Sequence, residues 1–97
     1  MEQLQEQAKE VAEMMGLLAN ENRLLILCAL LEQPMTVGAL SQQLPNISMP
    51  AISQHLQKLR SGKLIEVERH GQYMQYHIKD RRLYALMALL KEQYCNN

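Results

Sequence analysis

The chain is 97 residues long, which supports one hydrophobic core, so we expect a single domain over residues 1–97 that a subunit interface would help to stabilise. Hydrophobic residues make up 47% of it and charged residues 21%, which excludes the charge-rich, apolar-poor composition of a disordered chain. The formal net charge of zero excludes a generally cationic protein, but residues 1–33 carry a net charge of −4 and residues 48–72 one of +2.

The N-terminus is rich in Glu and Gln and lacks the basic segment and apolar stretch of a secretion signal. The longest apolar run, residues 24–31, is far too short to span a bilayer. We therefore expect a cytoplasmic protein with no membrane contact. Its two cysteines, Cys28 and Cys95, are far apart in the sequence, which suits a reducing compartment where thiols stay free unless they are oxidised for a purpose.

The first third of the chain has the pattern of two helices. Apolar residues recur at intervals of three and four from Leu4 to Leu18, which predicts an amphipathic helix over about residues 2–18. Asn20 is a typical N-cap for a second helix that Pro34 closes. Because this second helix is almost entirely apolar, we expect it at the centre of the core.

Two short helices follow. Thr36 can cap a third helix over residues 37–44, which Pro45 ends, and Ser48 can cap a fourth that Gly62 ends. The inner face of the fourth helix carries Ile52, Leu56 and Leu59. Its outer face then carries Gln54, Gln57 and Lys58.

In the last third of the chain, the apolar residues first alternate, as in strands, and then recur with a helical period. Alternation from Leu64 to Ile78 predicts a β-hairpin that turns near residues 70–72. Asp80 can cap a final helix, and Cys95 lies at its end. The apolar stripe of this helix is made of Leu83, Met87, Leu90 and Tyr94. Since so small a core offers the stripe no obvious partner, we expect it to pair with its twofold copy in a homodimer.

This order of elements is that of a winged helix-turn-helix, a mainly α fold with a small β-hairpin as the wing. In such folds the second helix of the motif enters the major groove, where the amides of Gln54 and Gln57 can pair with adenine and Lys58 can reach phosphate. A helix-turn-helix is by itself a weak signal, because bundles that never touch DNA contain it as well.

Two segments resemble the ArsR/SmtB family of repressors. The run Leu-Ala-Asn-Glu-Asn-Arg-Leu-Leu-Ile-Leu at residues 18–27 is similar to the family's second-helix signature. The segment 48–65, with Ile-Ser-Gln-His-Leu at 52–56, is similar to its recognition helix. The resemblance implies a homodimer, built from the first and last helices, on a roughly palindromic double-stranded operator. One departure is Lys63, where the family more often has glycine, and it affects the shape of that turn.

The resemblance also implies which side chains contact DNA. Ser48, Ser53, Gln54 and His55 would do so from the fourth helix, with Arg69 and Gln72 of the wing near the minor groove or the backbone. Lys58, Arg60 and Arg69 are candidates for phosphate contacts, and the alternative for them is solvated surface charge. Ser53 and His55 lie at the flanks of the inner stripe, so packing or capping is the alternative for these two.

The sequence offers little for metal binding or catalysis. The ArsR/SmtB family binds metals through Cys-x-Cys in the third helix or through Asp, His and Glu on the last helix, and neither pattern occurs here. His70 and His77 lie on the predicted wing, where we expect them to be solvated or to face DNA. No paired carboxylates, nucleophile elbow or glycine-rich phosphate loop is present. We expect no metal, no cofactor and no enzyme activity.

The cysteines leave alternatives open. Taken alone, Cys28 is a small core residue between Leu24 and Leu31, and Cys95 is a tail thiol. One cysteine on the second helix and one at the end of the last resembles the family's dithiol branch, which senses persulfides and related oxidants. That resemblance implies a repressor switched by bridging Cys28 and Cys95. The alternatives are a winged-helix regulator with structural cysteines, controlled by expression or a metal, and an interaction module that has lost DNA binding.

Overall fold

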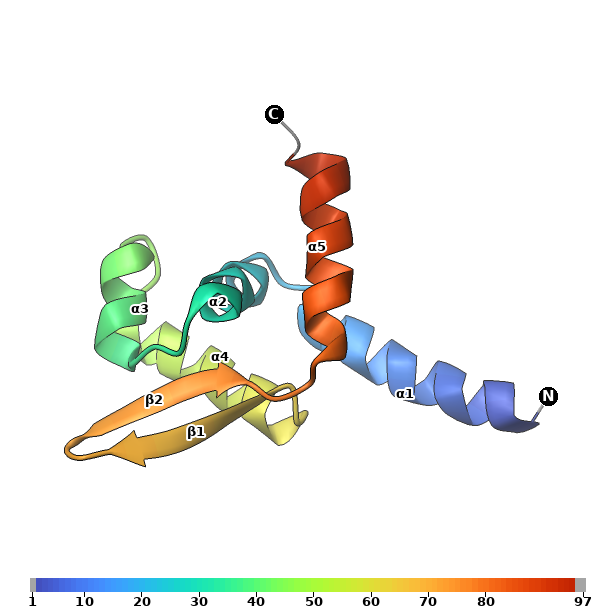
Figure 1. Ribbon diagram of the computed structural model, residues 1–97, viewed down its shortest axis with the longest axis horizontal. Coiled ribbons are helices and arrows are strands. Elements are labelled where there is room, and N and C mark those ends of the chain that lie inside the picture. The colour runs from blue at the N-terminus through green and yellow to red at the C-terminus, as the bar shows by residue number, and fades with distance from the viewer. Residues whose placement is uncertain (1, 96–97) are drawn as a thin grey trace.

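The structure is a computed structural model that describes residues 2–95. It contains five helices and one antiparallel two-stranded hairpin, which confirms the predicted winged helix-turn-helix (Figure 1). In chain order the elements are α1 (Glu2–Leu18), α2 (Glu21–Glu32), α3 (Val37–Gln43), α4 (Met49–Ser61), β1 (Ile65–His70), β2 (Tyr73–Ile78) and α5 (Arg82–Tyr94).

The core forms around α2, as its apolar sequence predicts. Ile26, Leu27 and Leu30 of α2 are buried and share one cluster with the inner face of α4. The fully buried residues outside α2 are Leu40, Ile52, Leu56, Leu59, Ile65 and Leu83. Each such side chain contributes about 1.5–3 kcal/mol by leaving water, so this cluster fixes where α3 and α4 sit on α2.

Side-chain caps begin three of the helices. Asn20, Thr36 and Ser48 each accept a hydrogen bond from the backbone N–H three residues on, at 3.1, 3.1 and 3.2 Å. The cap predicted for the last helix is displaced, because Arg81 and not Asp80 occupies the N-cap position of α5 and makes no side-chain cap. Asp80 instead accepts from the backbone N–H of Arg82 at 3.0 Å, since it lies one residue farther out.

The turn after α4 begins at Gly62, which ends the helix as predicted. Gly62 caps the helix with an ordinary φ of −80°, and Lys63 takes the left-handed conformation, with φ 64°. The Lys63 N–H donates to the Arg60 carbonyl and the Leu64 N–H to the Leu59 carbonyl, both at 3.0 Å, which is a Schellman motif. The glycine therefore ends the helix, and the left-handed position belongs to the lysine that follows it.

The wing is anchored at its base and free at its tip. Ile65 pairs with Ile78 at the base and His70 with Tyr73 at the tip, leaving a two-residue turn in which Gly71 has φ 63°. Met35, just before α3, exchanges two backbone hydrogen bonds with Tyr76, at 3.0 and 2.7 Å. The base therefore moves with the α2–α3 unit, while the tip extends past it (Figure 1).

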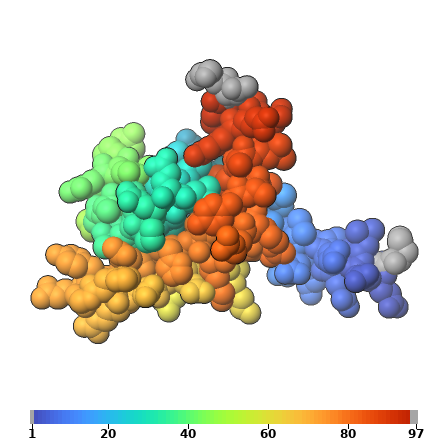
Figure 2. Space-filling view, in the orientation of Figure 1, coloured from blue at the N-terminus to red at the C-terminus, as the bar shows by residue number. Residues whose placement is uncertain are grey.

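The two outer helices leave apolar surface uncovered. The N-terminal half of α1 extends away from the rest of the chain (Figures 1 and 2), and Leu4, Val11 and Met15 are exposed. On α5 the predicted stripe is divided, because Leu83 and Met87 pack into the chain's own core while Tyr94 is 83% exposed. The expectation that this stripe has no partner within the chain was therefore wrong for its first half. We call the large exposed apolar residues of α1 and α5 the assembly surface. They are Leu4, Val11, Met15, Tyr84, Leu89 and Tyr94.

Among residues 2–95 no single helix combines the length and hydropathy of a membrane span. Helices α1 and α2 have that length and hydropathy only when they are taken together, and the two helices meet at an angle of 96°.

Candidate nucleic-acid interface

The outer face of α4 is polar and open. Gln54, Gln57, Lys58 and Ser61 are all exposed and line one shallow groove. This arrangement follows from helical spacing, because the buried Ile52, Leu56 and Leu59 occupy the opposite side. We call these four residues the recognition face. It presents amide donors and acceptors beside one cation, the combination that can address base edges and phosphate together.

Leu17, at the end of α1, borders the recognition face. It lines the same groove and lies over Gly62, where a Cβ would overlap its side chain. Glycine at this position therefore lets α1 approach the end of α4. The end of α1 is thus in direct contact with the candidate interface, a contact that the sequence analysis did not predict.

His55 lies at the flank of α4 and is half-buried, as its position beside the inner stripe predicts. Burial lowers its pKa, and the nearby charges of Arg23 and Lys58 lower it further. The ring is therefore neutral at pH 7, with one donor and one acceptor nitrogen. Its Nδ1 atom is buried and has no hydrogen-bond partner in the described part of the chain.

Arg23 joins α1 to α2. Its Nε donates to the carbonyl of Leu17 at 2.6 Å, and its Nη2 lies 3.5 Å from the carbonyl of Gly16. These carbonyls belong to the last turn of α1, where a cation also complements the helix dipole. The sequence analysis used this arginine only as part of a family signature. The structure makes it the link that fixes the end of α1 beside His55 and the recognition face.

The other candidates on α4 lie at its edges. Ser53 and Arg60 are exposed, and Arg60 lies roughly 120° around the helix from Gln54. The Ser48 side chain caps the helix by accepting from Ala51, which leaves its hydroxyl hydrogen to donate outward. Ser48, Ser53 and Arg60 are thus all accessible at the surface of α4.

The two predicted wing residues lie at the hairpin tip. Arg69 and Gln72 are exposed, and Arg69 Nε donates to the carbonyl of Gly71 at 3.0 Å. This bond holds the guanidinium near the turn. Strand alternation puts Arg69 on the opposite face from Glu66 and Glu68, so the wing's acidic groups are turned away from its arginine.

The acidic face of the wing pairs with the two wing histidines. His77 Nε2 lies 3.9 Å from Glu66, and His70 Nε2 lies 3.7 Å from Glu68. Lys79 approaches the same Glu66 at 3.7 Å. All of these pairs are partly or well exposed, so each is worth little in stability. In residues 2–95 no three His, Cys, Asp or Glu side chains gather as a metal site would require.

The two cysteines lie within electrostatic range of each other. Cys28, on α2, is half-buried and Cys95, just after α5, is exposed. Burial raises the pKa of Cys28, Lys91 lowers it, and Cys95 and Glu32 raise it. The two predicted thiols thus lie on α2 and at the end of α5, near enough for the charge of Cys95 to act on Cys28.

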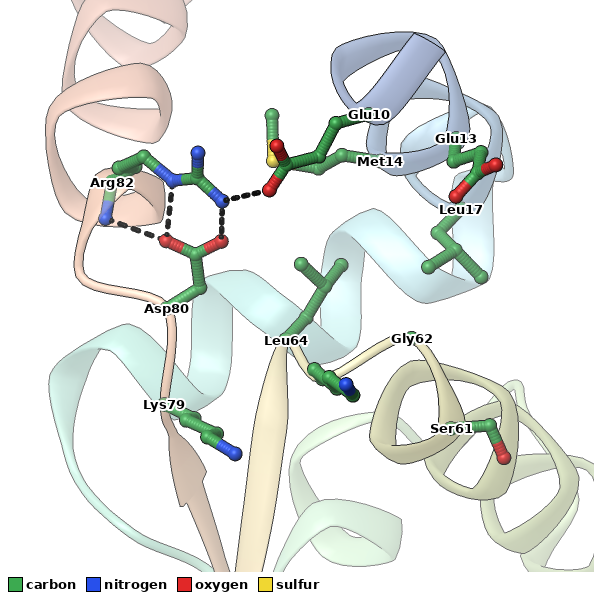
Figure 3. A pocket seen from close by; sticks show the side chains of 11 residues that line it. Glu10, Glu13, Met14, Leu17, Ser61, Gly62, Leu64, Lys79, Asp80 and Arg82 are labelled. Atoms are coloured by element: carbon green, nitrogen blue, oxygen red, sulfur yellow. Dashed lines mark hydrogen bonds and ion pairs between the residues drawn. The ribbon is translucent and has the colours of Figure 1, made fainter. Parts of the chain in front are cut away.

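A groove of about 710 Å³ separates α1 from the start of α5 (Figure 3). Arg82 bridges it, with Nη2 at 2.7 Å from Asp80 and 3.8 Å from Glu10. The hydrogen bond from Arg82 lowers the pKa of Asp80. This network ties α1 to the start of α5 and was not foreseen from the sequence, since Glu10 is one of many acids on α1.

Comparison with known proteins places the chain in a family. Residues 20–67 match the model for bacterial regulatory proteins of the arsR family. The chain is 40% identical over 95 residues to the transcriptional activator HlyU of Vibrio cholerae, covering 95% of the chain and 87% of HlyU. The structure of reduced HlyU from that organism superimposes with a TM-score of 0.89, at 32% identity, covering 99% of this chain and 100% of that one.

Two further solved structures are similar. The transcriptional repressor BigR from Xylella fastidiosa has a TM-score of 0.88 at 30% identity, covering 99% of this chain and 97% of BigR. A homodimeric winged helix-turn-helix DNA-binding domain from Mycobacterium bovis has a TM-score of 0.79 at 28% identity, covering 98% of this chain and 90% of that one. On this evidence the chain belongs to the arsR family of bacterial regulatory proteins and is a winged helix-turn-helix transcriptional regulator.

Proposed function

We propose that this protein is a single-domain, homodimeric repressor that binds a roughly palindromic operator with α4 and the wing, and leaves it when Cys28 and Cys95 are bridged. The observation that carries the first part is the recognition face. Two amides and a lysine stand on one open side of a helix whose other side is fixed in the core. Such a helix can enter the major groove without rearranging the fold.

Each part of the interface has a distinct role in this proposal. Gln54 reads a base edge, since a carboxamide can pair bidentately with adenine. Lys58, Arg60 and Arg69 contact phosphate, and Gln72 follows the minor groove or the backbone at the wing tip. Ser48, Ser53 and His55 complete the contacts from α4. A regulator that binds chromosomal DNA in this way works in the cytoplasm.

The assembly surface supports a homodimer. Leu4, Val11 and Met15 form one exposed stripe along α1. Leu89 and Tyr94 add exposed apolar area on α5. The similar domain from Mycobacterium bovis is homodimeric. A twofold dimer through α1 and α5 covers both surfaces and presents two copies of α4 about one DNA turn, roughly 34 Å, apart.

The thiol pair supports the switch. The exposed Cys95 thiolate takes the outer sulfur of a persulfide RSSH and releases RS⁻. The Cys28 thiolate then attacks the inner sulfur on Cys95, so that a disulfide forms, the S–SH bond breaks and HS⁻ leaves. Two thiols are oxidised, and the persulfide is reduced to a thiol and hydrogen sulfide.

The bridge acts on operator binding through geometry. It joins α2, which carries α4 on its core face, to α5, which contributes to the dimer interface. Locking these helices together changes the spacing of the two recognition helices, and an operator with fixed half-sites binds the altered state less well. Among the relatives HlyU is described as an activator and BigR as a repressor, so the direction of regulation needs its own measurement.

Fluorescence anisotropy with DNA from upstream of the protein's own operon tests the proposal. Reduced protein should bind tightly, persulfide should release the DNA, and a reductant should restore binding. Cys28→Ser and Cys95→Ser should each bind DNA and ignore persulfide. If Cys95→Ser responds to persulfide like the wild type, the dithiol switch is wrong. If reduced protein shows no preference for upstream DNA over random DNA, the repressor itself is wrong. A reporter fused to that promoter then distinguishes repression from activation.

A further inference from the structure

The side chain of Arg23 closes the corner between α1 and α2. Its Nε donates to the Leu17 carbonyl at 2.6 Å, and its Nη2 lies 3.5 Å from the Gly16 carbonyl. Only residues 19 and 20 separate the two helices, which meet at 96°. The carbonyls of the last helical turn have no partner within the helix, so Arg23 satisfies groups that the end of α1 leaves open. The direction of α1 is therefore tied to the first turn of α2.

Leu17 extends this tie to α4. Its side chain lies over Gly62, where a Cβ would overlap it, and lines the groove of the recognition face (Figure 3). Burial and then the positive charge of Arg23 lower the pKa of His55, so the guanidinium also lies within electrostatic range of α4. The backbone of Leu17 is thus held by α2, and its side chain contacts α4.

Helix α1 connects this corner to the assembly surface. Along Glu2–Leu18 only Leu18 is buried, while Met14 and Leu17 pack against the core in part. The N-terminal half of the helix extends away from the rest of the chain (Figure 1). The helix has 17 residues and is roughly 25 Å long. Because a continuous helix is stiff, the position of its exposed half relative to α4 is set at the end where Arg23 holds Leu17.

We propose that Arg23 is a positioning residue for operator binding, which fixes the distance and rotation between the two recognition faces of the dimer and so selects one half-site spacing. The inference rests on the proposed function and names the feature of the operator that this residue selects. Without Arg23, α1 can turn about residues 19–20, and the dimer samples several separations of its recognition faces. The matched operator then has to select one of them, which lowers its affinity. This role is separate from that of Gln54, which reads a base within one half-site.

Operator spacing tests the inference. Arg23→Met keeps the apolar stem of the side chain and removes its hydrogen-bond donors. Anisotropy titrations compare the upstream operator duplex, the same duplex with two base pairs inserted between the half-sites, and a duplex with one half-site. The insertion turns one half-site by roughly 70° and moves it by about 7 Å. It should weaken wild-type binding by about 100-fold, because the second half-site is lost. Arg23→Met should lower this ratio by about fivefold and bind the single half-site like the wild type.

Two further variants separate the link from general effects. Arg81→Met removes an exposed arginine at the start of α5 that makes no side-chain cap, and should keep the wild-type ratio. Leu17→Ala removes the contact with Gly62 and should lower the ratio as Arg23→Met does. The double variant should lose less than the product of the two single effects, because both act on one link. The inference is overturned if Arg23→Met keeps the wild-type ratio. It is also overturned if Arg23→Met weakens binding to the single half-site as much as to the operator, since Arg23 would then support the fold or contact phosphate.

A distance measurement without DNA distinguishes this inference from the proposed function. A spin label at Gln57→Cys, in full-length protein carrying Cys28→Ser and Cys95→Ser, gives the distance between the two recognition faces by pulsed electron paramagnetic resonance. Arg23→Met should broaden the distribution of this distance, and Arg81→Met should not. If it broadens while the reduced wild type shows no preference for upstream DNA, the repressor is wrong and the positioning role of Arg23 stands. If the wild type binds upstream DNA and neither the distribution nor the spacing ratio responds to Arg23→Met, the repressor stands and the positioning role is wrong.

Discussion

The α2–α4 unit and the outer helices differ in how much of their apolar surface this chain covers by itself. In the first, Ile26, Leu40 and Leu56 are all completely buried. On α1 only Leu18 is buried, and Leu4 is 60% exposed. The difference indicates that the α2–α4 unit, the proposed reading unit, is shaped by the chain's own core, whereas α1 leaves most of its apolar stripe exposed within residues 2–95. Substitutions in the two regions should therefore fail in different ways.

The largest expected effect lies in the core of the reading unit. Leu56→Ala removes a fully buried side chain between α4 and α2, which should destabilise the protein by about 2–5 kcal/mol. Urea unfolding followed by circular dichroism measures this loss, and DNA binding should fall together with the folded fraction. A stability loss below about 1 kcal/mol would show that α4 is not held by this core.

On α1 the expected failure is in assembly. Val11→Glu places a charge in the middle of the exposed stripe, at a side chain that is 41% exposed in the single chain. The variant should keep its helical circular dichroism but sediment as a monomer, and operator affinity should fall by about 100-fold because one half-site is lost, close to 2.7 kcal/mol. Gln5→Glu adds the same charge off the stripe and should remain dimeric. Val11→Glu that stays dimeric at micromolar concentration would refute an interface through α1.

A third substitution leaves both fold and assembly intact and tests the recognition face. Gln54→Ala should lose about 1–3 kcal/mol of operator binding and relax preference at one base pair in each half-site. Lys58→Ala should weaken binding to all sequences alike and lower the salt slope by about one unit. Anisotropy titrations over a panel of single-base operator variants separate the two. Unchanged operator affinity in Gln54→Ala would mean that another face of the protein reads DNA.

The elements were predictable because local signals decided them. Asn20, Thr36 and Ser48 each cap the helix that the sequence assigned to them. Contacts between distant segments were not predictable in the same way. Nothing in the periodicity of α5 distinguishes Leu83, which is buried in the chain's core, from Tyr94, which is exposed, because the sequence does not state where the helix leaves the core.

In the candidate site, too, local spacing could be predicted and contacts between distant segments could not. Helical spacing alone placed Gln54 and Lys58 on the open side of α4. The bond from Arg23 to Leu17 and the contact of Leu17 with Gly62 depend on the angle between α1 and α2, which no local pattern encodes.

The smallest expected effect concerns the turn that joins α4 to the wing, the place where the reading unit itself carries strain. Lys63 has φ 64°, a conformation that costs a residue with a Cβ about 1–2 kcal/mol and costs glycine almost nothing. Lys63→Gly removes that strain but makes the unfolded chain more flexible, so the net gain should be about 0.5 kcal/mol. At fixed protein concentration the melting temperature should rise by about 2–4 °C. The neighbouring Gly62→Ala provides the contrast: its φ of −80° suits alanine, but the new Cβ displaces Leu17, so it should give no such gain. A lower melting temperature for Lys63→Gly would mean that the lysine side chain contributes more at this turn than its backbone conformation costs, and that the reading unit is unstrained after all.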